Sequence, residues 1–280
     1  MKPKYYITLL KLFRLIIITG LIFVLIMPFV KIFIDAINVS DDPLSQWIPS
    51  KVSFSVFSKT AQRIIANDSL LNTIVLSTVA MIIQVVSTSL YGYAFAKLKF
   101  RGSEIIFWIF MTSLIVPYHV LENSRLYFMV YQTQYITSVY LRVVQLFVFT
   151  GLGMGIRSVL FIYIFRQYFR SIPNELIEAA EIDGCNAVKT YWLVMLPNAQ
   201  GAIITVAIFS FIWQWNDYEY ASLFSLAGNG FDTLAGVIVQ NRFYGSVNVY
   251  GLIIMIPLLV LYIIVQNKFI DSVEKVVIIG

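Results

Sequence analysis

Long apolar runs without charged side chains alternate with short polar segments along the chain. A bilayer core of about 30 Å needs about 20 mostly apolar residues in a helix, because a backbone in lipid has to satisfy its own hydrogen bonds. The runs therefore predict six membrane-spanning helices. They cover residues 15–30, 69–96, 105–121, the pair 143–156 and 158–165, 190–216, and 243–267. We expect an all-α polytopic membrane protein in which residues 15–268 form a single transmembrane domain.

The first apolar run also has one feature of a secretory signal peptide. Lys2, Lys4, Lys11 and Arg14 precede it, as cations precede the apolar part of such peptides. No small-residue cleavage pattern follows the run, however, and Pro28 and Lys31 interrupt its end. We interpret it as a retained first membrane helix.

The composition agrees with this pattern. Of the 280 residues, 59% are hydrophobic and only 12% are charged, and the mean hydropathy is +0.80. Soluble domains carry about 25% charged residues, so a water-soluble globule is excluded. The longest hydrophilic segments, 37–67 and 166–197, are too short for an independent soluble domain. We therefore expect any soluble machinery to be supplied by a partner.

The excess of cations reports the direction of the chain in the membrane. A net charge of +5 could indicate nucleic-acid binding, but cationic loops also tend to stay in the cytoplasm. Twelve of the twenty Lys and Arg residues fall in four segments that would lie inside if the N-terminus does, and these are 1–14, 97–103, 166–197 and 268–280. We expect a cytoplasmic N-terminus at 1–14, a cytoplasmic tail at 269–280, and no nucleic-acid partner.

The residues that usually carry catalysis or bind metals are scarce. Cys185 is the only cysteine and His119 the only histidine, which excludes an internal disulfide and makes a multi-thiolate or histidine-rich metal site untenable. The chain has no Gly-x-x-x-x-Gly-Lys-Ser/Thr phosphate loop. We therefore predict that it is not an enzyme and holds no catalytic residue, metal or cofactor of its own.

The inner segment 170–197 has a helix-turn-helix pattern. Residues 175–182 are strongly helix-forming, and Glu175 stands where a carboxylate complements the helix N-terminus. Asp183 and Gly184 predict a turn, and a second short helix should run from 187 to 195. These residues alone leave open a plain amphipathic helix at the membrane surface.

The spacing within this segment is similar to a known motif. Glu178-Ala179-Ala180, Asp183-Gly184 and Val194-Met195-Leu196-Pro197 resemble the EAA loop of ABC importer permeases. The resemblance implies the MetI-like ABC permease fold and a coupling helix that docks in a cleft of a cytoplasmic ATPase. It assigns ATPase coupling to Glu175, Glu178, Ala179, Ala180, Asp183, Gly184 and Pro197. Residues 170–197 are called the coupling loop below.

Other segments extend the resemblance to the carbohydrate-uptake branch, in particular to the second membrane subunit of maltose and oligosaccharide importers. The matching segments are Asn72-Thr73, 93–102, Val116-Pro117, 172–176 and 215–218. The last residues, 277–280, depart from the Lys-Gly ending of many relatives.

This resemblance implies a complete set of partners. They are a second permease subunit in a heterodimer, two ABC ATPase subunits that bind the ATP, an extracytoplasmic sugar-binding protein, membrane lipid, and an oligosaccharide substrate. The expected location is the bacterial cytoplasmic (inner) membrane, with a multi-pass topology.

The polar end of the fifth predicted span supplies candidate pathway residues. Sugar sites combine aromatic faces with amides or carboxylates, and Trp213, Trp215, Asn216 and Tyr218 offer both. An aromatic belt at the membrane interface is the alternative. Trp213 and Asn216 are the preferred pathway residues, although a buried Asn216 could instead bond across helices.

Two cations lie within predicted spans. Lys31 precedes Asp35 by one helical turn, so we expect it to pair with that carboxylate or to reach the interface. Arg157 lies deeper, and a pathway or interhelical role stays open.

Three alternatives to a sugar importer subunit stay open. One is the same importer class with glycerol phosphate or another small solute, and another is a transporter or channel that needs no ATPase. The third is a membrane-anchored scaffold without a pathway.

Overall fold

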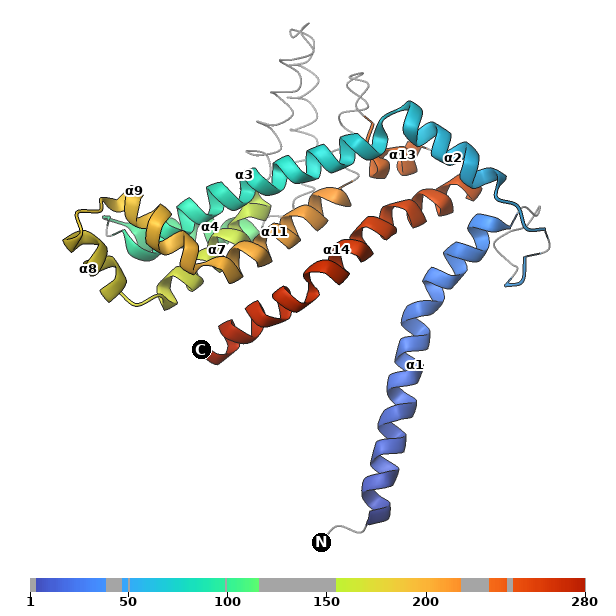
Figure 1. The fold of residues 1–280 in the computed structure, drawn as a ribbon, viewed down its shortest axis with the longest axis horizontal. Coiled ribbons are helices and arrows are strands. Elements are labelled where there is room, and N and C mark those ends of the chain that lie inside the picture. Colours follow the sequence, from blue (N-terminus) through green and yellow to red (C-terminus); the bar gives the residue numbers. More distant parts are fainter. Residues whose placement is uncertain are drawn as a thin grey trace, which may run out of the picture. The chain divides into compact units, whose positions relative to one another are not determined.

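The structure is a computed structural model that describes residues 4–38, 47–49, 51–98, 100–115, 155–217, 232–240 and 244–279. Every element in these residues is a helix, and their only β-pairing is an isolated antiparallel bridge between Asn38 and Val52 (Figure 1). The helices are α1 (Lys4–Ile37), α2 (Ser55–Ala66), α3 (Ser69–Lys97), α4 (Ser103–Thr112), η1 (Ser113–Ile115), α7 (Gly155–Ser171), α8 (Glu175–Ile182), α9 (Ala187–Thr190), η3 (Tyr191–Met195), α10 (Leu196–Asn198), α11 (Gln200–Trp215), α13 (Leu234–Gln240) and α14 (Tyr244–Ile279). The all-α prediction is confirmed.

Three of the predicted spans coincide with helices that are long and apolar enough to cross a membrane. These segments are Leu9–Ile37, Ser69–Lys97 and Val247–Asn267. The predicted span at 105–121 begins in α4 and η1, and its remainder, with residues 143–154, lies outside the described part of the chain. The total of six spans stays a prediction.

The apolar run predicted as a span at 190–216 is not one continuous helix. The chain bends by 80° between Ala187–Asn198 and Gln200–Trp215. Pro197 has no N–H for the helical hydrogen bond to residue 193, and the π-helical turn η3 precedes it. The membrane helix α11 therefore begins at Gln200, after the break.

The described chain divides into two compact units. The first comprises Met1–Asn67 and Ile238–Pro257, and the second comprises Asp68–Val237 and Leu258–Gly280. In the first unit, the Lys31 ammonium lies 2.5 Å from an Asp35 carboxylate oxygen, which confirms the predicted pair. The prediction of a single transmembrane domain over 15–268 is not tested by this division.

The core of the second unit lies where α3 packs against α7 and α11. Buried aromatic and aliphatic side chains fill it, including Phe161, Phe165, Phe169, Met195 and Val206. Gly92 lets α3 and α7 approach closely, because a Cβ at this position would lie 2.5 Å from the Phe165 Cβ. The close contact fixes α3 against the helix that leads into the coupling loop.

Polar side chains lie in the interface between α3 and α11. The buried Ser210 hydroxyl donates to the Gln84 side-chain oxygen, which joins the two helices. One turn further along α11, Gln214 is buried, and both its side-chain nitrogen and oxygen lack a hydrogen-bond partner among the described residues. Within the described residues, the interface thus contains one satisfied amide and one unsatisfied amide.

Candidate functional site

The first helix of the coupling loop begins as its sequence predicts. The Asn174 carbonyl accepts hydrogen bonds from the Ile177 N–H at 2.9 Å and the Glu178 N–H at 3.0 Å. Glu175 and Glu178 occupy the first turn of α8, where carboxylates complement the partial positive charge of the free N–H groups. Pro173 precedes Asn174, the N-cap residue of α8.

The predicted turn after α8 is a Schellman motif. The Cys185 N–H donates to the Ala180 carbonyl at 2.9 Å, and the Gly184 N–H donates to the Glu181 carbonyl at 3.0 Å. Gly184 has φ +77°, a left-handed conformation that side chains with a Cβ rarely adopt. Asp183 is the C-cap residue before it. Gly184 therefore ends the helix and sets the direction of the chain beyond it.

The second helix of the loop starts at a side-chain cap. Asn186 has an extended backbone, and its Oδ1 accepts a hydrogen bond of 2.9 Å from the Lys189 N–H. The helix continues through η3, in which Tyr191 and Met195 are buried. The predicted helix at 187–195 is thus present in two parts, α9 and η3.

One side of α8 is open and mixes charge with apolar surface. Glu175, Glu178 and Ala179 are exposed there, and Ile182 is 87% exposed. Val188 at the start of α9 is also exposed, at 64%. Apolar side chains this exposed in a short loop mark a contact surface, so Ile182 and Val188 belong to the candidate site although our residue assignments omitted them. Their signal in the sequence is an aliphatic residue on either side of a polar turn.

The assigned coupling residues divide into two groups. Glu175, Glu178, Ala179, Asp183, Gly184 and Pro197 are exposed. Ala180 is only 5% exposed, so its methyl group packs within the chain. A direct contact between Ala180 and another protein is therefore disfavoured in this arrangement.

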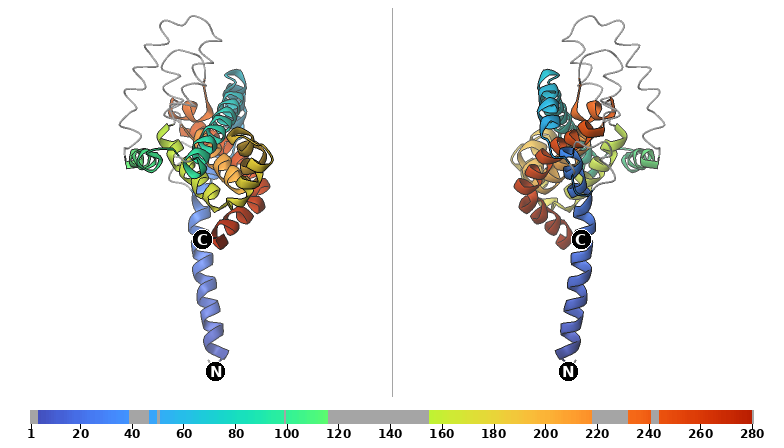
Figure 2. Two further views of the ribbon diagram at one scale, coloured as in Figure 1. Left: turned by 90° about the vertical axis from the view of Figure 1, so that its left-hand side faces the viewer. Right: turned by 90° about the vertical axis from the view of Figure 1, so that its right-hand side faces the viewer.

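The C-terminal end of α3 holds the coupling loop by hydrogen bonds. The Lys97 ammonium donates to the Ile172 carbonyl and to the Asn174 Oδ1, both at 2.7 Å. The Tyr93 hydroxyl donates to the Ala187 carbonyl at 3.2 Å. Figures 1 and 2 show α8 and α9 beside this end of α3. Tyr93 and Lys97 fall in the motif 93–102, but its residues alone did not indicate this contact.

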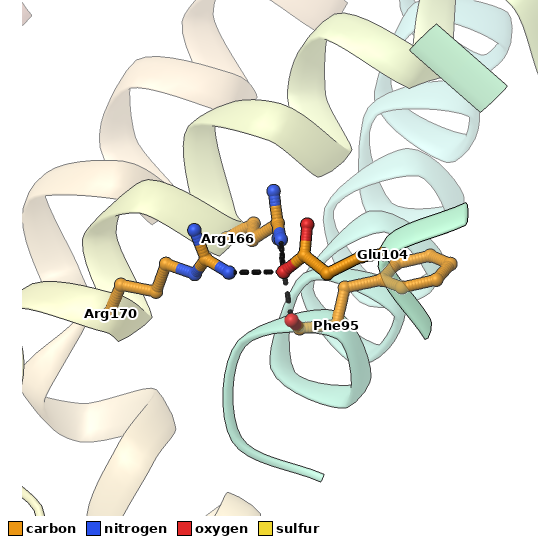
Figure 3. Close-up of polar contacts among 4 residues, drawn as sticks. All are labelled: Phe95, Glu104, Arg166 and Arg170. Carbon is orange, nitrogen blue, oxygen red and sulfur yellow. Dashed lines mark hydrogen bonds and ion pairs between the residues drawn. The ribbon is translucent and has the colours of Figure 1, made fainter. Parts of the chain in front are cut away.

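A charged cluster joins α4 to α7 (Figure 3). The Glu104 carboxylate accepts hydrogen bonds from the guanidinium groups of Arg166 and Arg170. Arg166 is buried, donates to the Phe95 carbonyl at 3.3 Å, and lies 3.7 Å from the centroid of the Phe107 ring. Glu104 immediately precedes the predicted span at 105–121, and its hydrogen bond to Arg166 lowers the pKa of the carboxyl, with Arg170 adding to the effect.

This cluster is an ion-pair network and not a metal centre. It holds a single carboxylate, whereas the oxygen ligands of metal ions come in larger sets. Among the described side chains, no group of three or more His, Cys, Asp or Glu residues could hold a metal ion.

The predicted pathway residues differ in their surroundings. Trp213 is half-buried and stacks on Phe161, with ring centroids 5.0 Å apart, whereas Trp215 is 1% exposed and stacks on Phe211. Asn216 is exposed, and its Nδ2 donates to the Ile212 carbonyl of its own helix at 2.9 Å. Asn216 therefore caps α11, and within the described part of the chain its side chain makes no hydrogen bond to another helix.

Three other residues named in the sequence analysis cannot be placed. Tyr218 and His119 lie outside the described residues, as does the side chain of Arg157. The structure thus brings Trp213 and Asn216 to the end of α11 with part of their surface open, and it buries Trp215.

The chain matches a known family over most of this region. The family model described as "Binding-protein-dependent transport system inner membrane component" matches residues 89–271. The matched segment begins in α3, includes the coupling loop and α11, and extends into α14.

Curated relatives align along most of the chain. The melibiose/raffinose/stachyose import permease protein MelC of Bacillus subtilis is 26% identical, and the alignment covers 89% of each chain. The probable starch degradation products transport system permease protein AmyC of Thermoanaerobacterium thermosulfurigenes is also 26% identical, with 81% of each chain covered.

A solved structure has a similar fold. It is a crystal structure of a bacterial ABC transporter involved in the import of the acidic polysaccharide alginate. The TM-score is 0.72 at 18% identity, and the alignment covers 96% of this chain and 99% of the other. At this identity the likeness shows the fold alone.

Proposed function

This chain belongs to the family of binding-protein-dependent transport system inner membrane components, and on that premise we propose that it forms half of the pathway for an oligosaccharide. It is a multi-pass permease subunit of an ABC importer, located in the cytoplasmic membrane, and it has the MetI-like ABC permease fold. Permeases of this family are transport components and not enzymes.

The substrate proposal is supported by the names of its relatives. MelC imports melibiose, raffinose and stachyose, and AmyC is a probable transporter of starch degradation products. Both names indicate short saccharides. Glycerol phosphate or another small solute stays the second candidate, and the experiments below include it.

The importer is proposed to contain four other proteins. A second permease subunit completes the pathway as a heterodimer, and two ATPase subunits bind and hydrolyse ATP. An extracytoplasmic binding protein delivers the sugar. This chain contributes no nucleotide site, since its sequence has no phosphate-binding loop.

The open side of α8 is the observation that carries the coupling proposal. Glu175 and Glu178 place negative charge beside exposed Ile182, so the surface suits a cleft with cations at its rim and an apolar floor. When the two ATPase subunits close around ATP, the cleft carries α8 with it. Hydrogen bonds of α3 to the loop pass that displacement to the membrane helices.

Sugar is proposed to pass the outer end of α11. Trp213 presents part of an aromatic face and Asn216 an exposed amide, which are the groups that contact the C–H face and the hydroxyls of a pyranose. Trp215 is buried and packs within the chain.

This part of the proposal predicts that Trp213→Ala raises the KM for sugar uptake while ATPase association is unchanged.

The docking proposal is tested with the complete importer purified in detergent. We expect Glu178→Lys to weaken association of the ATPase subunits about tenfold, which corresponds to about 1.4 kcal/mol at 25 °C. Lys59→Glu, at an exposed position of α2, is the matched control, because it also reverses a charge but lies outside the loop. Equal affinity for the natural chain and Glu178→Lys would contradict the docking assignment.

A further inference from the structure

Three polar side chains on one side of α3 reach the coupling loop at three different places. Ser89, Tyr93 and Lys97 are four residues apart, so they lie one above another on the helix. The Ser89 hydroxyl lies 2.7 Å from the Tyr191 hydroxyl at the start of η3. Together with the Tyr93 and Lys97 bonds described above, this contact joins α3 to residues at or just before the starts of α8, α9 and η3.

The acceptors of the Tyr93 and Lys97 bonds fix the main chain of the loop. Ile172 and Ala187 accept through their backbone carbonyls, and Asn174 is the N-cap residue of α8. Because carbonyls are part of the backbone, α8 cannot move far from α3 while these bonds persist. The side chains of Ser89 and Tyr93 are buried, whereas the bond between Lys97 and Asn174 is exposed.

The opposite end of α3 is bonded to a second distant segment. The Asn72 Nδ2 donates to the Asp232 carbonyl at 3.0 Å, and the buried Thr73 hydroxyl accepts from the Leu234 N–H at 2.9 Å. Residues 232 and 234 lie in segment 217–242, between the predicted spans at 190–216 and 243–267, which the predicted topology places on the outer side, opposite the inner segments. Figure 1 shows α13, which begins at Leu234, beside the end of α3 remote from α8.

The body of α3 is rigid enough to join its two ends. Twenty-five residues of helix separate Asn72 from Lys97, which is about 37 Å at 1.5 Å per residue. Between them α3 has no proline, Gly92 packs closely on α7, and Gln84 bonds to α11. A displacement at either end is therefore transmitted along the helix with its neighbours.

We propose that α3 transmits the state of the outer segment at 232–234 to the coupling loop, with Asn72 and Lys97 as its positioning residues. This inference rests on the proposed function, because it names how that importer senses an event at its outer face. Lys97 acts by holding Asn174 and Ile172, and Asn72 acts by holding Asp232. Neither residue touches sugar or nucleotide.

The first test measures ATP hydrolysis by the complete importer in proteoliposomes. Its binding protein is added with raffinose, maltotriose or glycerol 3-phosphate, and the most effective solute is used for all variants. Lys97→Met removes the donor but keeps the aliphatic stem, and Lys97→Arg restores a cation. We expect Lys97→Met to reduce the stimulation by the binding protein at least fivefold while basal hydrolysis stays within twofold, and Lys97→Arg to recover most of the stimulation.

A double-mutant cycle separates transmission from two local effects. Residues about 37 Å apart normally have additive effects. We expect Asn72→Ala to reduce stimulation, and Asn72→Ala combined with Lys97→Met to be no worse than Lys97→Met alone. Multiplicative losses, or undiminished stimulation in Lys97→Met, would overturn the inference.

The second test does not depend on the substrate or on hydrolysis. Amide hydrogen exchange of the purified importer is compared between the natural chain, Asn72→Ala and Asn67→Ala, an exposed control five residues away. We expect faster exchange at 175–191 in Asn72→Ala only, and unchanged exchange there would refute transmission. The proposed function fails if no solute stimulates ATP hydrolysis by the natural importer, or if the Glu178→Lys variant keeps its ATPase subunits. In either case the exchange rates at 175–191 still decide whether α3 transmits a change from Asn72 to the coupling loop.

Discussion

Gly184 and Gly92 lack a side chain for different physical reasons. Gly184 adopts φ +77° in open space, since a Cβ there would meet nothing within 4 Å. Gly92 has an ordinary helical backbone, but a Cβ there would collide with the Phe165 Cβ and approach the backbone nitrogen of Arg166 to 3.0 Å. One glycine therefore permits a turn and the other permits a helix contact, so their substitutions have separate consequences.

Substitution of Gly184 tests the turn. Gly184→Ala forces a Cβ into the left-handed region, which costs about 1 to 2 kcal/mol. We expect the coupling loop to change direction after Ile182 and the affinity for the ATPase to fall about tenfold, measured by titration of the purified subunits. Gly184→Asn is the control, because Asn tolerates this conformation better and should keep most of the affinity. Equal affinities for all three chains would contradict the role of the turn.

Substitution of Gly92 tests the close packing of α3 on α7. Gly92→Ala introduces a methyl group next to backbone and Cβ atoms that cannot move aside, and overpacking of this kind costs about 1 to 3 kcal/mol. We expect a lower unfolding temperature in detergent. Gly20→Ala, at a helical position with open space, should not lower it. The same unfolding temperature for Gly92→Ala and Gly20→Ala would show that α3 and α7 can move apart at position 92 without a loss of stability.

The Glu104 carboxylate gives the chain a predictable response to pH. Its pKa is lowered in the folded state, chiefly by the hydrogen bond from Arg166, so the stabilisation is present above the ordinary carboxyl pKa. It is lost as the pH falls through the folded-state pKa. Thermal unfolding of Glu104→Gln and the natural chain should therefore differ most near neutral pH and converge in acid. A difference that stays constant down to about pH 3 would contradict the ion pair.

At the scale of elements, the interface of α3 and α11 contains two glutamines in contrasting states. The Gln84 side chain accepts a hydrogen bond from Ser210, whereas the buried amide of Gln214 has no partner among the described residues. A buried polar group without a partner costs free energy, and removing one member of a bonded pair leaves the other unsatisfied. Replacing Gln84 should therefore lower the free energy of unfolding, whereas replacing Gln214 should not lower it.

A pair of Leu substitutions tests this contrast. Gln84→Leu should lower the free energy of unfolding by about 1 to 3 kcal/mol, because Ser210 loses its acceptor. Gln214→Leu should be neutral or stabilising, since leucine is similar in size to glutamine and lacks the amide that has no partner among the described residues. Chemical unfolding in mixed micelles measures both, and an equal loss in the two variants would show that the Gln214 amide is hydrogen-bonded after all.

The elements that depend on neighbouring residues could be predicted from the sequence. Helix 175–182 and its end at Gly184 follow from helix-forming residues, a first-turn carboxylate and a glycine. The bend at Ala199 was not predicted, because the apolar run at 190–216 shows only that the segment is apolar and not where its axis changes. Pro197 marked the place, but a proline can also begin a helix without a bend.

Contacts between distant residues could not be predicted. Lys97 and Asn174 are 77 positions apart, and nothing in a single sequence pairs an ammonium with one amide among many. Trp213 and Trp215 are two residues apart in an aromatic run, yet only the packing of α11 decides that Trp215 is buried. The Lys31–Asp35 pair was predictable because the two residues lie one helical turn apart.

At the scale of the whole molecule, the chain is one permease subunit whose chemistry is supplied by others. Its helices hold one exposed loop at one end of α3 and bind a predicted outer segment at the other end. In the proposed importer, α3 would therefore connect the loop that docks on the ATPase to the segment at 232–234. The proposed function depends above all on a contact between the open side of α8 and the ATPase.

Site-specific cross-linking tests that claim most directly. Cys185 is the only natural cysteine, so a Cys185→Ala background allows one reactive thiol to be placed at will. In the complete importer, Ile182→Cys should form a single adduct with an ATPase subunit when treated with a short thiol-to-amine reagent, and Lys59→Cys on α2 should form none. Absence of the Ile182→Cys adduct, or its formation at equal yield from Lys59→Cys, would contradict the account.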